Sequence, residues 1–510
     1  MKIPRTLPIV GTVLAVAAAA VLAGAATAPP APSLYTPTQG WWPPGDGPAL
    51  PSRGLYDDPE GSVGLLNASG DIATTGHPFF QPIGTNGRAC VTCHQPEDGM
   101  SLSAVTAQSR WDATHGADPL FAAIDGSNCP SLPQDQVASH SLLLKQGLIR
   151  VFLPWPPKRA DGTAVKPQFD LEVVKDPTGC NTDPVYGLKS VHPTVSVFRR
   201  PRVVANLKFV TQGGAPFNVK DGTVMDRDPL TGRFVNMDIM ADSREPTLRT
   251  QAIDAALTHL QAKAAPSDAQ LKQILAFESQ IYSAQARSSA AGDLTEQGGP
   301  SGLGPKALRD GSAGLGDNFY TPIFGYFDQW AKSTETSTSA EFRRSVARGM
   351  EVFFTRPFYI RDVTHLNTVG LGNPVRRTCA TCHNAKLVGM DFAPGYMDLG
   401  TGNRPWSQAL PTTDDLPLFK LTCHTERDAH PYLGKVVFTH DPGRALISGR
   451  CADIGAITMQ QFRGLAARAP YFSNGSAATL MDLVEYYNKR FGARYTDQEK
   501  QDLVNFLGVL

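Results

Sequence analysis

The spacing of apolar residues along the chain predicts helices separated by long irregular connections. Helical patterns, with apolar residues three to four positions apart, occur in five segments: 247–264, 266–287, 339–354, 479–491 and 496–510. In the last segment, Thr496 and Glu499 have the spacing of an N-terminal capping box. The intervening stretches are rich in Pro and Gly, which interrupt regular structure. The pattern therefore predicts a mainly α-helical fold with long irregular loops.

A different pattern marks the N-terminus. Lys2 and Arg5 precede an apolar run over residues 7–22, and small residues follow as far as the A-T-A sequence at 26–28. This order is typical of a secretory signal peptide, so we expect residues 1–28 to be cleaved and the mature protein to be periplasmic. A membrane anchor is the alternative, but the apolar run is short for a membrane span.

The composition limits the classes of partner. The 510 residues are enough for two or three domains, and 41% of them are hydrophobic, which supports buried cores. The 47 basic residues balance the 47 acidic ones. We therefore expect no nucleic acid as a partner, and no membrane contact once the signal is cleaved.

The motif C-x-x-C-H occurs twice. The first copy is "CVTCH" at 90–94 and the second is "CATCH" at 379–383. The chain has only eight cysteines and eleven histidines, so chance would place about 0.003 copies in it. Two copies therefore indicate a chemistry that both sites share.

Three chemistries use cysteine pairs of this spacing. A zinc site needs four ligands and leaves the two histidines unexplained, and a redox dithiol needs no histidine after its second cysteine. Covalent haem c accounts for every residue, because two thioether bonds hold the porphyrin and the adjacent histidine binds its iron. We therefore expect two covalently bound haem c groups at Cys90, Cys93, Cys379 and Cys382, with His94 and His383 as axial iron ligands.

The other four cysteines form two neighbouring pairs in the sequence. Cys129 and Cys180 lie in stretches rich in Pro, Gly and Asn, and Cys423 and Cys451 bracket the segment that follows the second motif. We expect the disulfides Cys129–Cys180 and Cys423–Cys451, which an exported protein is able to form.

The two motifs divide the chain into two haem units. Residues 29–60 are rich in Pro and are expected to form an extended leader, followed by an N-terminal haem c domain over 61–290. A Gly/Ser-rich linker over 291–338 precedes a C-terminal haem c domain over 339–510. Each unit is expected to be a helical, cytochrome c-like domain with long loops.

Three stretches besides the motifs carry a family resemblance: "FRRPRVVANLKF" at 198–209, "MADSREPTLRTQA" at 240–252 and a long segment at 453–488. With them, the chain resembles the bacterial di-haem cytochrome c peroxidase family, which includes the MauG-type enzymes and, more distantly, the di-haem rubber oxygenases. The resemblance implies that the N-terminal haem is peroxidatic, with an open iron position. It implies that the C-terminal haem is six-coordinate and relays electrons.

The resemblance also implies a second axial ligand for the C-terminal haem. Peroxidases of the family use Met, whereas MauG-type enzymes use a Tyr that follows the histidine of a P-Y-F-H element by fourteen residues. Ser473 stands in place of that histidine here, so the matching ligand is Tyr487. The alternatives are Met390, Met397 and Met459. A phenolate ligand would hold ferric iron and lower its potential, whereas Met raises it.

Peroxide cleavage at the N-terminal haem needs an acid/base group and a polar partner near the iron. The family uses a Gln followed ten residues later by a Glu. Gln251 matches the first, but Gln261 stands at the second position and cannot carry a proton. We therefore expect His259, on the same helix face as Gln251, to be the acid/base. Glu245 is a second candidate, and His115 is a candidate for blocking the iron in a resting state.

Two departures from the family bear on mechanism. The Trp between the haems is replaced by Ala241, so electrons must cross between the haems by another route. At the family's calcium site between the haem domains, a Thr is replaced by Arg468. Two expectations compete there: one Ca²⁺ between the domains, or the charge of Arg468 in its place.

Three functions are compatible with the sequence. The first is a periplasmic oxidoreductase that reacts with hydrogen peroxide at the N-terminal haem. It would act as a cytochrome c peroxidase served by a small electron-donor protein, or as a MauG-like oxidase that forms a high-valent di-haem state and oxidises a protein or organic substrate. The second is an electron-transfer di-haem cytochrome. The third is a haem dioxygenase resembling the rubber oxygenases, which predicts an apolar distal pocket. We expect the first.

Overall fold

The fold combines helices with sheets, which corrects the prediction of a mainly helical protein. The computed structural model places strands in five sheets within the part of the chain that it describes. Several of them come from segments that looked like loops. Their sequences do carry a strand signal, as in "LIRVFLP" at 148–154 and "TVSVFR" at 194–199, which are rich in β-branched and aromatic residues. The runs are short and flanked by Pro or Gly, so the longer helical patterns outweighed them.

The structure describes residues 36–38, 40–158, 162–211, 239–294, 300, 302–311, 324–366, 372–383, 396–410 and 413–510. The predicted signal peptide, 1–28, and the candidate ligand Met390 lie outside the described residues. Contacts along the chain group residues 35–510 into one compact unit. Among the helices of the described part, none is long and apolar enough to cross a membrane.

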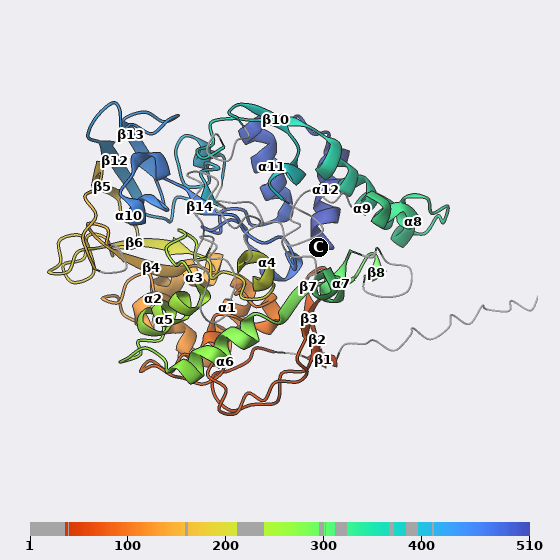
Figure 1. Ribbon diagram of the computed structural model, residues 1–510, viewed down its shortest axis with the longest axis horizontal. Helices are drawn as coiled ribbons and strands as arrows, with labels where there is room; N and C mark the ends of the chain where they lie inside the picture. Colours follow the sequence, from red (N-terminus) through yellow and green to blue (C-terminus); the bar gives the residue numbers. More distant parts are fainter. Residues whose placement is uncertain are drawn as a thin grey trace, which may run out of the picture. The chain divides into compact units, whose positions relative to one another are not determined.

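One sheet has the strand order β1-β2-β3-β7-β8 (Figure 1). Its strands are β1 (Thr36–Thr38), β2 (Arg53–Asp58), β3 (Gly61–Asn67), β7 (Ile281–Ser288) and β8 (Gly292–Asp293). β2 and β3 form an antiparallel hairpin, and β7 pairs antiparallel with β3. The sheet therefore joins the start of the described chain to the segment that follows α6.

β7 shows why the helical prediction for 266–287 was wrong in its second half. Helix α6 (Asp268–Glu278) begins after Ser267, whose hydroxyl accepts a hydrogen bond from the Gln270 amide. The next strand is β7, in which almost every side chain is buried. A strand buried on both faces shows no alternation of apolar and polar residues, so its apolar positions extended the helical pattern.

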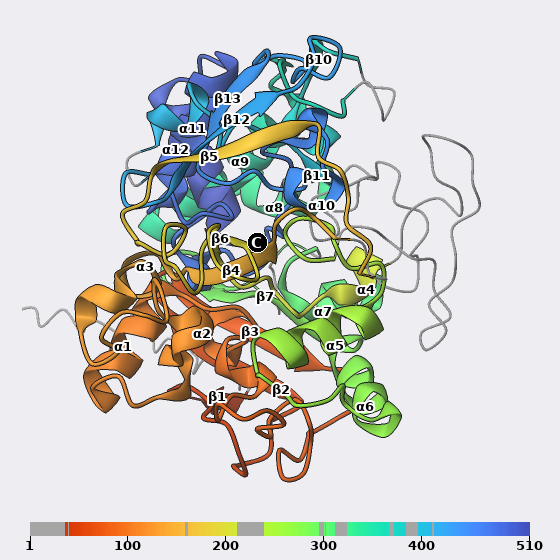
Figure 2. The ribbon, with the colours of Figure 1, turned by 90° about the vertical axis from the view of Figure 1, so that its left-hand side faces the viewer.

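Two further sheets connect distant parts of the chain. β4 (Ile149–Pro154) pairs antiparallel with β6 (Thr194–Arg199). β5 (Phe169–Lys175) pairs with β12 (Leu418–Cys423), which pairs in turn with β13 (Val436–Thr439). Figure 2 shows β5 beside β12 and β13. One sheet therefore contains strands from both sides of the predicted linker, and the proposed domain boundaries stay predictions.

Two short antiparallel ribbons lie near the second motif in the sequence. β9 (Phe358–Ile360) pairs with β10 (Val375–Arg377), which ends just before Cys379. β11 (Tyr396–Met397) pairs with β14 (Ile457–Thr458). Both ribbons contribute residues to the cavity around the second motif.

The described helices are α1 (Ala104–Thr114), α2 (Ala123–Gly126), α3 (Ser141–Gln146), α4 (Leu207–Thr211), α5 (Leu248–Thr258), α6 (Asp268–Glu278), α7 (Gly304–Gly311), α8 (Asp328–Ala331), α9 (Thr338–Thr355), α10 (Ala445–Ser448), α11 (Leu480–Phe491) and α12 (Asp497–Gly508). Helices α9, α11 and α12 closely match the predicted segments. Thr496 and Glu499 form the predicted capping box, with the Glu499 amide 3.1 Å from the Thr496 hydroxyl. Side-chain capping explains why these helix starts were readable from sequence.

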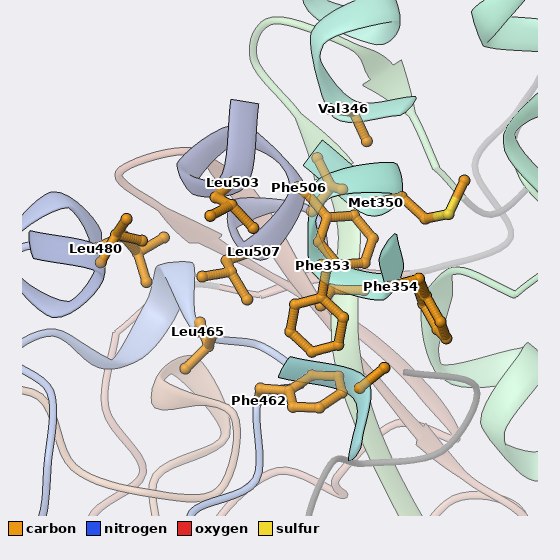
Figure 3. Packing of buried hydrophobic residues seen from close by; sticks show 14 of the residues in the cluster. Val346, Met350, Phe353, Phe354, Phe462, Leu465, Leu480, Leu503, Phe506 and Leu507 are labelled. Carbon is orange, nitrogen blue, oxygen red and sulfur yellow. The ribbon is translucent and has the colours of Figure 1, made fainter. Parts of the chain in front are cut away.

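The two motifs pack against hydrophobic cores that they partly share. The first core includes Phe79 and has Cys90 of the first motif and Cys382 of the second against it. Figure 3 shows the second core, in which Phe353 of α9 contacts both Phe506 of α12 and Phe462. Because close-packed cores deform little, each motif is held on a rigid support.

The structure contains both predicted disulfides. Cys129 and Cys180 are joined with their Cα atoms 5.1 Å apart, and Cys423 and Cys451 with theirs 6.3 Å apart. The four cysteines of the two C-x-x-C-H motifs are free thiols. The eight cysteines therefore divide into two structural pairs and two pairs that keep their reactive sulfur atoms.

Candidate functional site

The two C-x-x-C-H motifs adopt the same backbone turn. Cys90–Thr92 and Cys379–Thr381 each form one turn of 3-10 helix. In both, the threonine hydroxyl accepts a hydrogen bond from the amide of the residue before the first cysteine. The histidine amide lies 3.2 Å from the first cysteine's carbonyl oxygen in both motifs. One local sequence, C-x-T-C-H, thus produces one local geometry twice.

This turn brings the reactive side chains of each motif into one cavity. Cys90, Cys93 and His94 line a cavity that we call the His94 cavity. The matching residues of the second motif line another, the His383 cavity. In the described part of the chain, no group of three or more His, Cys, Asp or Glu side chains is placed to hold a metal ion. The two cysteine pairs therefore do not combine into one zinc site there.

The state of these side chains favours covalent attachment over thiolate chemistry. Burial raises the pKa of the Cys90 and Cys93 thiols, which opposes the thiolate form that zinc sites and redox dithiols need. Burial lowers the pKa of His94 to about 4, so its ring is neutral near pH 7. Its Nδ1 atom is buried and has no hydrogen-bond partner among the residues that the structure describes. Two thiols beside a neutral imidazole form the donor set that haem c requires.

Two buried arginines line the His383 cavity without a carboxylate within ion-pair distance among the described residues. Arg200 donates to the carbonyl oxygens of Leu102 and Arg468, and its Nε atom is buried without a partner. Burial lowers the pKa of Arg200 to about 10 and that of Arg468 to about 9. Buried cations are normally paired with anions. Haem carries two carboxylates, and Arg200 and Arg468 are buried cations in the cavity lining that could pair with them.

Arg468 fills a ring of backbone oxygens. Its Nη2 atom lies 2.5 Å from the Gln461 carbonyl oxygen and 2.9 Å from that of Arg463, and its Nε atom 3.1 Å from that of Gly464. Carbonyl oxygens arranged in this way are also ligands for Ca²⁺. The arrangement favours the guanidinium as the cation at this loop, and the calcium ion stays a prediction.

Tyr487 lines the His383 cavity from α11, where the resemblance placed the second axial ligand. Its ring stacks on Phe491 with the centroids 6.0 Å apart. Burial raises the pKa of Tyr487, so a phenolate there requires a bound cation such as ferric iron. Met397 and Met459 line the same cavity, so both remain alternatives to Tyr487.

His259 lies in the wall of the His94 cavity and contacts a buried aspartate. It caps the C-terminus of α5, and its Nδ1 atom is 2.5 Å from an oxygen of Asp125. Asp125 also pairs with Arg88, and both side chains are 1% exposed. Burial alone would raise the pKa of Asp125, but Arg88 and His259 together hold it below its ordinary value. The carboxylate therefore accepts from Nδ1–H, which leaves the lone pair on Nε2.

The other candidates from sequence divide between the cavity and its surroundings. Gln251, two turns before His259 on α5, lines the His94 cavity. Glu245 is absent from the described lining, and burial raises its pKa. His115 is exposed and lies outside the described lining. Met240 does line the cavity, which bears on the alternative function below.

Two residues of this site were missed by sequence reasoning. Arg88 stands two positions before Cys90, and a charged residue so close to the motif was a usable sequence signal. If such an arginine is buried, it needs an acidic partner. Asp125 lies in "AAIDGSNC" on α2, and nothing in that stretch marks it as functional. Only the tertiary structure brings it to His259, 134 positions along the chain.

Glu278 is a third missed residue of the His94 cavity. It ends α6, is 4% exposed, and its Oε2 atom has no hydrogen-bond partner in the structure. Burial raises its pKa to about 8 from the ordinary 4.5. The carboxyl is therefore protonated at neutral pH, as an uncompensated buried acid must be.

We expect Glu278→Gln to change how stability depends on pH. The pKa of Glu278 is about 8 in the folded protein and 4.5 ordinarily, so unfolding releases a proton at pH values between these two. The free energy of unfolding then falls as pH rises from 4.5 towards 8. The variant should be more stable than the wild type by about 1–3 kcal/mol at pH 8 and nearly equal at pH 5. Urea unfolding at both pH values measures this, with exposed Glu426→Gln as control.

The two cavities share part of their walls. Arg200, Pro201, Gln460 and Gln461 line both. Ala241 lines only the His94 cavity in the described chain, and its carbonyl accepts a hydrogen bond from the Thr458 amide. The residues that line both cavities are therefore candidates for the route between the two motifs, and Ala241 is not among them.

Comparisons with known proteins add no assignment. No protein-family model matches the sequence, and no curated protein matches it. Among solved structures, the hydrazine synthase of Kuenenia stuttgartiensis pressurised with 20 bar xenon is similar with a TM-score of 0.29 and 12% identity. The alignment covers 62% of this chain and 73% of that one. A similarity this low carries no argument about fold or function.

Proposed function

We propose that this chain is a periplasmic di-haem c-type oxidoreductase that reacts with hydrogen peroxide at the His94 site. The observation that carries the proposal is the contact of His259 with buried Asp125 in the wall of the His94 cavity. Heterolysis of peroxide needs a group that takes a proton from one oxygen and gives it to the other. An imidazole with a free Nε2 lone pair can do both near pH 7.

The chain's own residues have separable tasks in this proposal. Haem, when bound, supplies the iron that binds peroxide and the electrons that reduce it. Asp125 holds the proton on Nδ1 of His259, and Arg88 keeps Asp125 ionised. Nε2 of His259 is then the atom that accepts and returns the peroxide proton. Gln251 offers a neutral amide to the same cavity as a hydrogen-bonding partner.

The His383 site is proposed as the electron relay. The resemblance to the di-haem peroxidase and MauG-type family supports this division of labour, and so does the wall shared by the two cavities. The partners are hydrogen peroxide and either a small periplasmic electron-donor protein or an oxidisable protein or organic substrate. Export is supported by the N-terminal signal pattern and by the two disulfides.

The test is electron paramagnetic resonance of the oxidised holoprotein before and after one equivalent of hydrogen peroxide. We expect a high-spin signal from an open iron at the His94 site and a low-spin signal from the His383 site. Both should decrease on peroxide addition. Two low-spin signals that do not respond to peroxide would refute the proposal.

An electron-transfer cytochrome is the second candidate function, and one observation favours it. Met240 lines the His94 cavity and so is a candidate sixth ligand for a haem iron there. With both irons six-coordinate, the same spectrum would contain two low-spin signals. The dioxygenase alternative predicted an apolar pocket without an acid/base group. Most side chains that line the His94 cavity are apolar, which fits that alternative, but the presence of His259 among them counts against it.

We expect Tyr487→Phe to change the His383 site selectively. Loss of a phenolate ligand should alter the low-spin signal and raise the reduction potential of that haem by on the order of 100 mV. Potentiometric titration with spectral detection measures the shift. The control is Tyr486→Phe, whose hydroxyl donates to the Leu399 carbonyl. An unchanged spectrum in Tyr487→Phe would move the ligand assignment to Met397 or Met459.

A further inference from the structure

The ribbon formed by β9 and β10 carries an unpaired basic surface. Tyr359 is 56% exposed, and Arg361, Arg376 and Arg377 are exposed beside it. We call these four residues the arginine ribbon. None of the three arginines has a carboxylate within ion-pair distance in the described structure, whereas neighbouring Arg356 is paired with Glu499.

The opposite side of the same ribbon forms part of the His383 cavity. Phe358 and Ile360 flank Tyr359 on β9 and line that cavity, because successive side chains of a strand point to opposite faces. β10 runs directly into Thr378 and Cys379, which also line it. Arg376 pairs in register with Tyr359. Tyr359 and Arg376 therefore share one face of the ribbon, opposite to the cavity-lining side chains. Arg377 pairs with Phe358 and Arg361 follows Ile360, so these two exposed arginines lie at the ends of the ribbon.

The charge of the ribbon is local. The whole chain has as many basic as acidic residues, so three neighbouring unpaired arginines are a departure from the average surface. On α6, which contributes Ile274 and Glu278 to the His94 cavity, Lys272 is exposed, and Arg249 of α5 is paired with Asp268. Unpaired guanidinium groups around an exposed tyrosine are the residue types that dominate the centres of protein interfaces.

We propose that the arginine ribbon is the docking surface for a small electron-donor protein with an acidic surface, which delivers electrons to the His383 site. The inference deepens the proposed function and rests on it. Each docking event passes one electron from the reduced donor, which is oxidised by one unit. Two donors and two protons then convert one hydrogen peroxide into two water molecules.

The test uses cytochrome b5, a small acidic haem protein, as the donor probe. Reduced cytochrome b5 is mixed with peroxide-treated holoprotein, and its oxidation is followed by stopped flow at low and high ionic strength. We expect the rate constant to fall about tenfold in the double variant Arg376→Glu/Arg377→Glu at low salt. The difference should shrink at high salt, where the charges are screened. The double variant to Lys should stay close to the wild type.

Two controls keep the result specific. Lys272→Glu changes an exposed charge near the other cavity and should leave the rate unchanged. The peroxide reaction without donor must be equal in all variants, which shows that they are folded and loaded. Calorimetric titration of the resting holoprotein with oxidised cytochrome b5 gives a readout independent of turnover, and the double variant should bind at least about tenfold more weakly.

The outcomes separate this inference from the proposed function. A wild type that ignores peroxide would refute the proposed function, while the titration still decides the docking surface. A normal peroxide reaction with donor rates and binding unaffected by Arg376→Glu/Arg377→Glu would overturn the docking surface. Self-association of the wild type that the double variant abolishes, without binding of cytochrome b5, would make the ribbon a contact between copies of this chain and would also overturn it.

Discussion

Substituting His259 with Ala is expected to slow the reaction of the holoprotein with hydrogen peroxide by about 10²–10⁴-fold at pH 7. The reason is the loss of an imidazole that lines the His94 cavity and whose tautomer is fixed by a buried carboxylate. The measurement is the second-order rate constant for the spectral change on peroxide addition. Haem content and the resting resonance spectrum should stay as in the wild type.

The matched control is His115→Ala, because His115 is exposed and outside the described cavity lining. Asp125→Asn is the complementary variant. The Asn amide can donate to Nδ1 of His259 and so favour the tautomer with the proton on Nε2. We therefore expect the rate constant for the reaction with peroxide to fall by at least about tenfold. A rate for His259→Ala within twofold of the wild type would contradict the assignment of His259 as acid/base.

Substituting Arg199 with Leu is expected to destabilise the protein by about 3–5 kcal/mol, because it leaves buried Asp441 without its ion-pair partner and buried Asp242 with Arg244 alone. Arg199 is 1% exposed. It contacts Asp242 at 2.5 Å and donates to both oxygens of Asp441, at 2.6 and 2.9 Å. Burial alone would raise the pKa of Asp242, but Arg244 and Arg199 hold it below its ordinary value. Chemical unfolding of wild type and variant measures the difference in free energy.

The control for this prediction is Lys306→Ala on α7. Lys306 forms an ion pair with Asp310 at 2.7 Å, but both side chains are about half exposed. Solvent screens such a pair, so its loss should change stability by less than about 1 kcal/mol. Equal effects of Arg199→Leu and Lys306→Ala would show that the Arg199 contacts carry no special stability.

Local sequence was sufficient wherever the structure is built from near neighbours in the chain. The two C-x-T-C-H turns, the capping box of Thr496 and Glu499, and the helices α9, α11 and α12 depend on residues within a few positions of one another. The disulfide pairs were readable because only four cysteines were left after the motifs. Periodicity predicted a helix over 247–264; α5 ends at Thr258, so Gln251 lies within the helix and His259 caps its C-terminus.

The fold class could not be read in the same way. Buried strands such as β7 have the composition of a buried helix, and β5 finds its partner β12 across more than two hundred residues. Sheet pairing depends on backbone hydrogen bonds between distant segments, and these leave little trace in any one window of sequence. The helical reading therefore failed where pairing was long-range.

The chemical features of the chain also divide into those set by local sequence and those set by tertiary structure. The sequence by itself determined which side chains are reactive: two cysteine pairs, their histidines, and His259 and Tyr487 as candidate partners. Only the tertiary structure decided what surrounds them: Asp125 and Arg88 beside His259, Glu278 in the same cavity, and a wall common to both cavities. The physical reason is that a residue's identity is local, whereas its burial, its charge partners and its pKa are set by segments that meet only when the chain folds.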